Sequence, residues 1–128
     1  SNLEKISSAQ MFHFDSDFSK FLKLYVYLSK VDENNGPHAY VEKTHFNKLK
    51  KHELQKGYSD KQIKGSYDSI KVVMGEKGTI FFEDSFGLHK GESPKNQCRL
   101  MLNIHYGNSN LKYSEYDKYH DFNDQIIN

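Results

Sequence analysis

Cysteine is almost absent from this chain, which has 128 residues and a single cysteine, Cys98. One cysteine excludes an internal disulfide bond and a zinc site built from several thiolates. Cys98 directly precedes Arg99, and we expect it to be a small, buried apolar residue.

The chain also lacks an excess of charge of either sign and any long hydrophobic run. It has 18 basic and 17 acidic residues, so no strong electric field favours nucleic acid or a membrane surface as a partner. No apolar run is long enough to cross a bilayer, and residues 1–12 lack the continuous apolar stretch of a secretory signal. We therefore expect a cytoplasmic protein that acts on a small molecule, with its oligomeric state left open.

Apolar residues make up only 36% of the chain, but nine phenylalanines and nine tyrosines are present. Aromatic side chains bury a large area each, so they can form a core in spite of the polar composition. The length suits one domain, which we expect to span residues 1–128.

Two stretches alternate strictly between apolar and other residues, 21–28 and 99–106. Alternation with a period of two residues is typical of a strand with two different faces. Shorter strands are expected at 38–41, 72–74 and 79–82, with turns at 32–37 and 75–78.

Residues 46–70 are rich in lysine and are expected to form a helical insertion. Phe46 and Leu49 would pack against the body of the domain in a first helix, 46–56, and Gly57 would end it. Ser59 and Gln62 have the spacing of a capping box, which predicts a second short helix. Residues 107–128 form a polar tail. Several strands with one helical insertion predict an all-β sandwich or barrel.

His13 and Asp15 form a His-x-Asp triplet, whose outer side chains point to the same side of a strand. Two histidines and one carboxylate make the facial triad of non-haem Fe(II) oxygenases, so a second histidine from elsewhere would complete the set. Taken alone, such a triplet is more often an ordinary surface pair.

His89 is the candidate for the third ligand, because Gly87 and Gly91 on either side let the backbone approach a crowded centre. Arg99 follows ten residues later on the polar face of the predicted strand 99–106, which would look into the barrel. A buried arginine needs an anionic partner, and its guanidinium grips a carboxylate in a bidentate fork.

Several segments together resemble phytanoyl-CoA dioxygenase-like proteins, in which they occur in the same order. The resemblance covers roughly residues 10–106 and rests on 13–15, 20–28, 31–38, 40–45, 78–84, 87–91 and 99–100. It implies a double-stranded β-helix, or jelly roll. It also implies that His13, Asp15 and His89 bind Fe(II) and that Arg99 binds the distal carboxylate of 2-oxoglutarate.

The family resemblance further implies a dioxygenase that hydroxylates a small organic substrate. O2 and 2-oxoglutarate would be consumed, and succinate and CO2 would form. Asp15 favours hydroxylation, because halogenating relatives replace this carboxylate with a small residue. The alternative is a catalytically silent jelly-roll module, or a fragment of such an enzyme, because only twelve residues precede His13 where relatives have a substantial segment. Many relatives also carry a hydroxyl residue at the position of Gly91.

Other residues have weaker claims. Tyr25 is a candidate to hydrogen-bond 2-oxoglutarate or to shape the substrate pocket, with wall packing as the alternative, and Asn103 is a candidate to line the cavity. His45 competes with His89 as third ligand, and His105 is expected to be structural. Supporting or turn roles are expected for His38, Glu83 and Asp84, and surface positions for His52 and His120.

Overall fold

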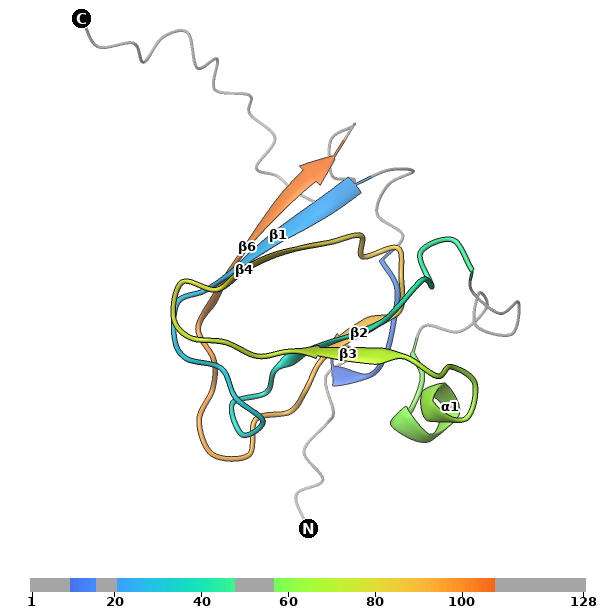
Figure 1. Cartoon of the computed structure of the whole chain (residues 1–128), viewed down its shortest axis with the longest axis horizontal. Coiled ribbons are helices and arrows are strands. Elements are labelled where there is room, and N and C mark those ends of the chain that lie inside the picture. Colours follow the sequence, from blue (N-terminus) through green and yellow to red (C-terminus); the bar gives the residue numbers. More distant parts are fainter. Residues whose placement is uncertain (1–9, 16–20, 48–56, 108–128) are drawn as a thin grey trace, which may run out of the picture.

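The computed structural model describes residues 10–15, 21–47 and 57–107, which form two three-stranded antiparallel sheets and one short helix (Figure 1). The protein is therefore all-β, as the sequence predicts. In chain order the elements are β1 (Phe21–Tyr27), β2 (His38–Val41), α1 (Asp60–Lys64), β3 (Ile70–Val73), β4 (Ile80–Glu83), β5 (His89–Gly91) and β6 (Met101–Gly107).

The first sheet has the order β4-β1-β6, with the longest strand at its centre. Side chains on a strand alternate between the two faces of its sheet. On β1 the side chains of Lys23, Tyr25 and Tyr27 are buried toward the second sheet, while Leu22 on the opposite face is exposed. The interior of the molecule is therefore lined here by polar and aromatic groups rather than by leucines.

The second sheet has the order β3-β2-β5 and carries the hydrophobic core on its outer face. Ala39 and Val41 of β2 point outward and are fully buried beneath α1, which lies beside this sheet and away from the first one (Figure 1). The cluster consists of Phe12, Ala39, Val41, Tyr58, Ile63 and Leu88. The inward face of the second sheet is left free for His38 and Tyr40.

Helix α1 begins with the predicted capping box. The Ser59 side chain accepts a hydrogen bond from the Gln62 backbone, and the Gln62 side chain accepts one from the Ser59 N–H. Of the predicted helix 46–56, Phe46 lies in a turn and is 73% exposed, so its expected packing against the body is wrong. Residues 48–56, with Leu49, lie outside the described residues, as does the tail after Gly107. Within the described ranges no helix is long and apolar enough to cross a membrane.

Strand positions agree with the sequence to within two residues, with two corrections. The last strand begins at Met101, so Arg99 precedes it instead of opening it. Cys98 is exposed, contrary to expectation, because it belongs to the irregular segment between β5 and β6, in which residues 93–98 are all exposed. β5 was not expected at all.

Lys90 of β5 is a buried cation that fastens α1 to the second sheet. Its Nζ donates to Asp60 Oδ1 at 2.7 Å in the first turn of the helix, lies 2.9 Å from Glu92 Oε2, and sits 4.9 Å above the Phe12 ring. The Lys90 side chain is only 4% exposed. A buried cation with two carboxylate partners stabilises the fold through a geometry that few other residues can copy.

We expect Lys90→Ala to lower the free energy of unfolding by about 1–2 kcal/mol, chiefly because a cavity opens where the buried side chain was, since the partly exposed Asp60 and Glu92 carboxylates can be solvated by water. Urea denaturation followed by circular dichroism measures the change. Lys77→Ala, at an exposed position, is the matched control and should change stability very little. Equal effects of the two substitutions would contradict the role given to Lys90.

Candidate metal centre

His13, Asp15 and His89 meet because the segment before β1 pairs with β5. His13 and His89 form an isolated antiparallel bridge, with His13 N donating to His89 O at 2.9 Å and His89 N donating to His13 O at 2.8 Å. Asp15 N then donates to Ser85 O at 2.9 Å. His89 is therefore at least 74 residues away from His13 and Asp15 in the sequence, but backbone hydrogen bonds hold all three segments together.

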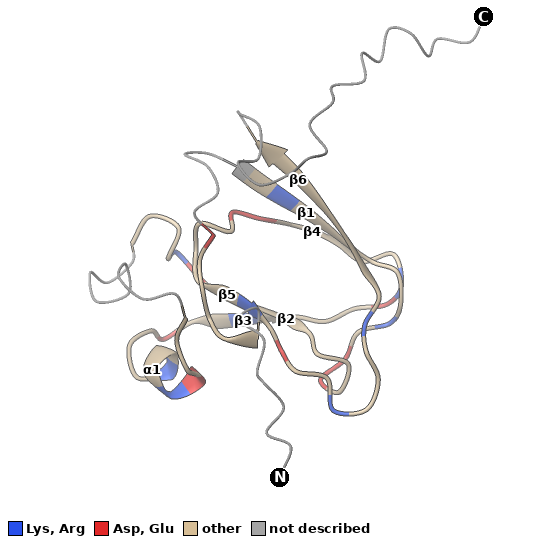
Figure 2. Ribbon diagram, turned by 180° about the vertical axis from the view of Figure 1, so that it is seen from behind, with Lys and Arg blue, Asp and Glu red and all other residues tan. Residues whose placement is uncertain are grey.

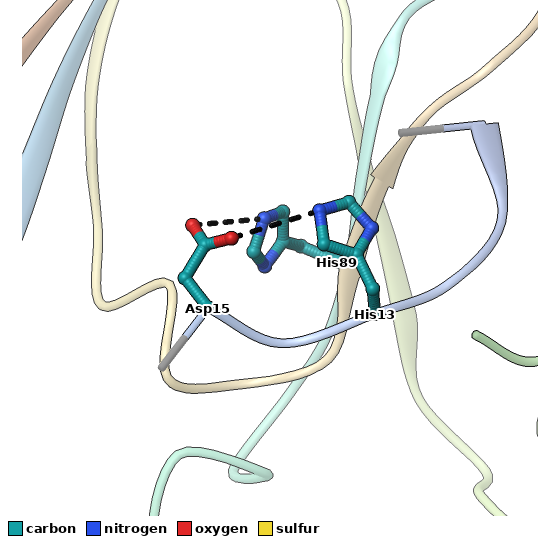
Figure 3. Close-up of side chains that lie close together, drawn as sticks. All are labelled: His13, Asp15 and His89. Atoms are coloured by element: carbon teal, nitrogen blue, oxygen red, sulfur yellow. Dashed lines mark ion pairs between the residues drawn. The ribbon is translucent and has the colours of Figure 1, made fainter. Parts of the chain in front are cut away.

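One donor atom from each of these three residues lies within 4.8 Å of the other two (Figure 3). The Nε2 atoms of His13 and His89 lie 3.8 Å from Asp15 Oδ1 and 3.6 Å from Asp15 Oδ2, respectively. Two imidazoles and one carboxylate that converge on one point make a site suited to a divalent metal ion. The predicted ligand set is therefore brought together.

Backbone carbonyls fix the orientation of both imidazoles. Nδ1 of His13 is 2.8 Å from Met11 O, and Nδ1 of His89 is 2.9 Å from Gly87 O. A carbonyl only accepts, so each Nδ1 carries the proton and each Nε2 keeps a lone pair directed toward Asp15. This second set of contacts is what holds a histidine ready for a metal.

The electrostatics of the centre favour the forms that bind metal. Burial lowers the pKa of His89 to about 4, so its ring is neutral at neutral pH. Burial raises the pKa of Asp15, but the hydrogen bond from Lys23 and the charges of neighbouring groups outweigh it, so that the pKa lies below its ordinary value. Lys23 is itself buried and forms an ion pair with Asp15 Oδ2.

An open cavity of about 330 Å³ lies beside the centre, between the two sheets. His13, His89, Tyr25 and Arg99 are among the residues that line it. Burial and two nearby carboxylates raise the pKa of Tyr25, which keeps it a neutral phenol. The remaining lining residues are Gln10, Lys23, His38, Gly91, Glu92, Pro94, Met101 and Asn103.

Two glycines permit this arrangement for steric reasons. A Cβ on Gly91 would lie 2.6 Å from Nη2 of Arg99, and a Cβ on Gly87 would overlap the Tyr40 side chain. Arg99 also donates a hydrogen bond through Nη1 to the carbonyl of Gly36, which has a φ of 75°. Gly91 therefore leaves room for the Arg99 guanidinium.

Sequence reasoning only partly anticipated a buried pair behind His89. His38 Nε2 lies 2.5 Å from Glu83 Oε2, and both side chains are 4% exposed. Glu83 Oε1 lies 3.6 Å from Nδ1 of His89 and has no hydrogen-bond partner among the residues that the structure describes. The sequence feature that could have identified Glu83 is the alternation of β4. Glu83 follows Phe81 by two residues, so both side chains lie on the face of the strand that points toward the centre. Asp84 has the expected turn role, accepting from Phe86 N at 3.1 Å.

Two other histidines are separate from the centre. His45 contacts the Tyr40 hydroxyl at 3.4 Å and the Phe46 ring, and it does not belong to the triad. His105 is exposed on β6 and does not line the cavity, whereas Asn103 on the same strand does. His52 and His120 lie outside the described residues.

The chain is thus an all-β protein of two antiparallel sheets with a candidate His-Asp-His metal centre between them. No family model matches this chain, and no curated protein matches it. Among solved structures its fold is similar to that of apo HygX from Streptomyces hygroscopicus, with a TM-score of 0.53 and 17% identity. The similarity covers 77% of this chain and 42% of the HygX chain, so this chain matches less than half of that protein. At this identity the likeness shows the fold alone.

The low pKa of His89 predicts how the stability of the metal-free chain depends on pH. The ordinary pKa of His89 is 6.5 and its pKa in the folded chain is about 4. Between these pH values, His89 is protonated in the unfolded state and neutral in the folded state. Stability is therefore fully present above pH 6.5 and falls by roughly 3 kcal/mol as the pH drops toward 4. Asp15 acts in the same direction, but below its ordinary pKa of 3.8.

Urea denaturation in the presence of a chelator, at several pH values between 7 and 4, measures this loss. His89→Gln removes the titrating group and should flatten the profile by the same amount. Profiles of equal slope in the two proteins would show that His89 does not titrate as stated.

Proposed function

We propose that this chain is the core of an Fe(II)- and 2-oxoglutarate-dependent dioxygenase of the phytanoyl-CoA dioxygenase-like type. The observation that carries the proposal is the convergence of His13 Nε2, His89 Nε2 and the Asp15 carboxylate, with both Nδ1 atoms tied to backbone carbonyls. The two sheets would then be the halves of a jelly roll, a fold that encloses such a centre between its sheets.

Iron is the metal that this donor set favours. Two imidazoles and one carboxylate are typical of non-haem Fe(II) oxygenases, whereas structural zinc sites use four protein ligands, often cysteines. When bound, the iron would supply the activation of O2. His13, Asp15 and His89 would hold the metal, and Glu83 and His38 would keep His89 in place from behind.

The cavity offers two cations to a dicarboxylate. Lys23, which pairs with Asp15, and Arg99 both line the same cavity. A 2-oxoglutarate molecule would direct its keto acid toward the metal and Lys23, and its distal carboxylate toward Arg99. The neutral Tyr25 phenol and the Asn103 amide would add hydrogen bonds.

Hydroxylation of a small organic substrate is the reaction that this arrangement suits. Asp15 occupies the carboxylate position, so no space is left at that ligand for a halide ion. The charge balance of the chain favours neither nucleic acid nor a membrane surface as the substrate.

The first test is an anaerobic titration. Fe(II) is added to the chain, then 2-oxoglutarate, and the visible charge-transfer band of the chelated keto acid is recorded. We expect a band that appears only with both additions, followed by succinate formation when O2 is admitted. Folded, iron-loaded protein that gives no band would overturn the proposal.

A catalytically silent jelly-roll module is the second candidate, and Lys23 favours it. Its ammonium group already neutralises Asp15 in a largely buried position, so the carboxylate has a partner without a metal. In such a module the cavity would bind an anion and no oxidation would follow.

Lys23→Met separates these candidates. In an oxygenase we expect the substitution to weaken 2-oxoglutarate binding about tenfold while Fe(II) still binds, because one cation is lost from the cavity. In a silent module the parent chain and Lys23→Met should both fail to bind Fe(II), and the substitution should only lower stability, by about 2–3 kcal/mol, because Asp15 is left largely buried and unpaired. Iron titration and urea denaturation of the same variant report on the two outcomes.

A further inference from the structure

The outer face of the β4-β1-β6 sheet consists of apolar side chains alone. Eight of its residues are more than one-third exposed, including Ile80 at 60% and Phe82 at 63%. The side chains of this outer apolar face are Leu22, Leu24, Val26, Leu28, Ile80, Phe82, Leu100, Leu102, Ile104 and Tyr106.

Strand register makes these residues one continuous patch. Val26 lies between its partners Ile80 and Leu102, and Leu24 lies between Phe82 and Ile104 in the next row. No charged residue interrupts these rows, and β6 is free of charged residues along its whole length (Figure 2). The patch is therefore an uncharged surface three strands wide.

The second sheet also has an apolar outer face, but there other parts of the chain cover it. On the outer face of its central strand β2, Ala39 and Val41 are fully buried beneath α1 and Tyr58, each with an exposed fraction of 0%. Nothing within residues 10–15, 21–47 and 57–107 covers the first sheet in this way, and α1 lies on the opposite side (Figure 1). One outer face thus belongs to the core, while the other is bare.

The size of the patch is that of one side of a stable protein interface. With ordinary side-chain areas its exposed residues offer roughly 700 Å² of apolar surface. The largest apolar patch on a typical monomer is about 300–600 Å², whereas standard interfaces bury about 800 Å² on each partner. A surface of this kind in water is expected to associate.

We propose that the outer apolar face is a dimer interface, occupied by the same face of a second copy of this chain. The absence of charge means that the face can meet itself without repulsion, as a two-fold interface requires. Two sheets pack face to face with interdigitated apolar side chains, and the rows of this patch supply such side chains. The metal centres lie on the inner side of each sheet, so both cavities would stay accessible.

Sedimentation equilibrium of the whole chain across micromolar concentrations tests the proposal. We expect a reversible dimer of twice the 15.0 kDa chain mass. Ile80→Lys combined with Leu102→Lys should weaken dimerisation at least about 100-fold, because both charges would be buried without partners. Val72→Lys, at an equally exposed apolar position on β3, is the matched control and should leave the dimer intact.

Circular dichroism and thermal unfolding establish that each variant is folded. If the lysine pair unfolds the chain, the milder pair Ile80→Thr and Leu102→Thr retains strand propensity and should weaken dimerisation about tenfold. A wild-type chain that stays monomeric overturns the proposal. If the monomer binds a hydrophobic dye, the outer apolar face is exposed and binds a different protein. If the monomer does not bind the dye, residues of its own chain cover this face. A dimer that survives the substitutions on this face also overturns the proposal.

Discussion

Asp15→Ala and His89→Ala are each expected to reduce Fe(II) affinity at least about 100-fold and to abolish the charge-transfer band with 2-oxoglutarate. Each substitution removes one of three converging donors, and the two that remain cannot hold the ion against water. His89 also contributes one half of the backbone bridge to His13, but through its main chain, which alanine preserves. The expected loss is therefore specific to the metal.

His45→Ala is the matched control, because His45 was the competing third ligand and lies outside the triad. It should bind Fe(II) as the parent chain does. Isothermal titration under argon gives the affinities, and circular dichroism confirms the fold. Equal losses for His45→Ala and His89→Ala would show that the ligand set is wrong.

Arg99→Ala is expected to raise the 2-oxoglutarate concentration needed for the band by about 100-fold while leaving Fe(II) affinity unchanged. A guanidinium bound to a carboxylate through two parallel hydrogen bonds contributes more than a single charge at the same place. Arg99 shares the cavity with His13 and His89 but is not one of the three candidate ligands, so metal binding should not depend on it.

Arg99→Lys keeps the charge and loses the fork, and it should fall between the parent chain and Arg99→Ala. Lys95→Ala, at an exposed position in the same connection, is the control for a general loss of positive charge. If a monocarboxylate 2-oxo acid binds equally well to the parent chain and to Arg99→Ala, the effect belongs to the distal carboxylate. An unchanged requirement for 2-oxoglutarate in Arg99→Ala would exclude Arg99 from cosubstrate binding.

Local patterns predicted most of the strands. The alternation in β1 and β6 was strong enough to place both, and the Ser59 capping box predicted the start of α1. β5 escaped because three residues are too few to show a period, and it exists only through its pairing with β2 and its bridge to His13. The wrong expectations for Cys98 and Phe46 share a cause, since hydrophobicity alone does not say what will cover a side chain.

The ligands of the candidate centre could be predicted because the identity of each single residue indicates its chemistry. His13, Asp15 and His89 could be found because a facial triad requires those residue types. The ion pair of Lys23 with Asp15 and the buried pair of His38 with Glu83 join residues from different strands, and no local pattern announces them. Alternation likewise defines two faces of a sheet but does not say which one is inside.

The bridge between His13 and His89 gives the metal a second significance. Few backbone hydrogen bonds connect residues 10–15 to β5, and the candidate ligands His13 and His89 lie on opposite sides of this connection. An ion bound by His13, Asp15 and His89 would cross-link residues 10–15 to β5. Every bound ion would then count toward the folded state by mass action. Loss of the metal would weaken the attachment of residues 10–15 to β5 at the candidate centre. Loss of metal and local unfolding of this segment would therefore occur together.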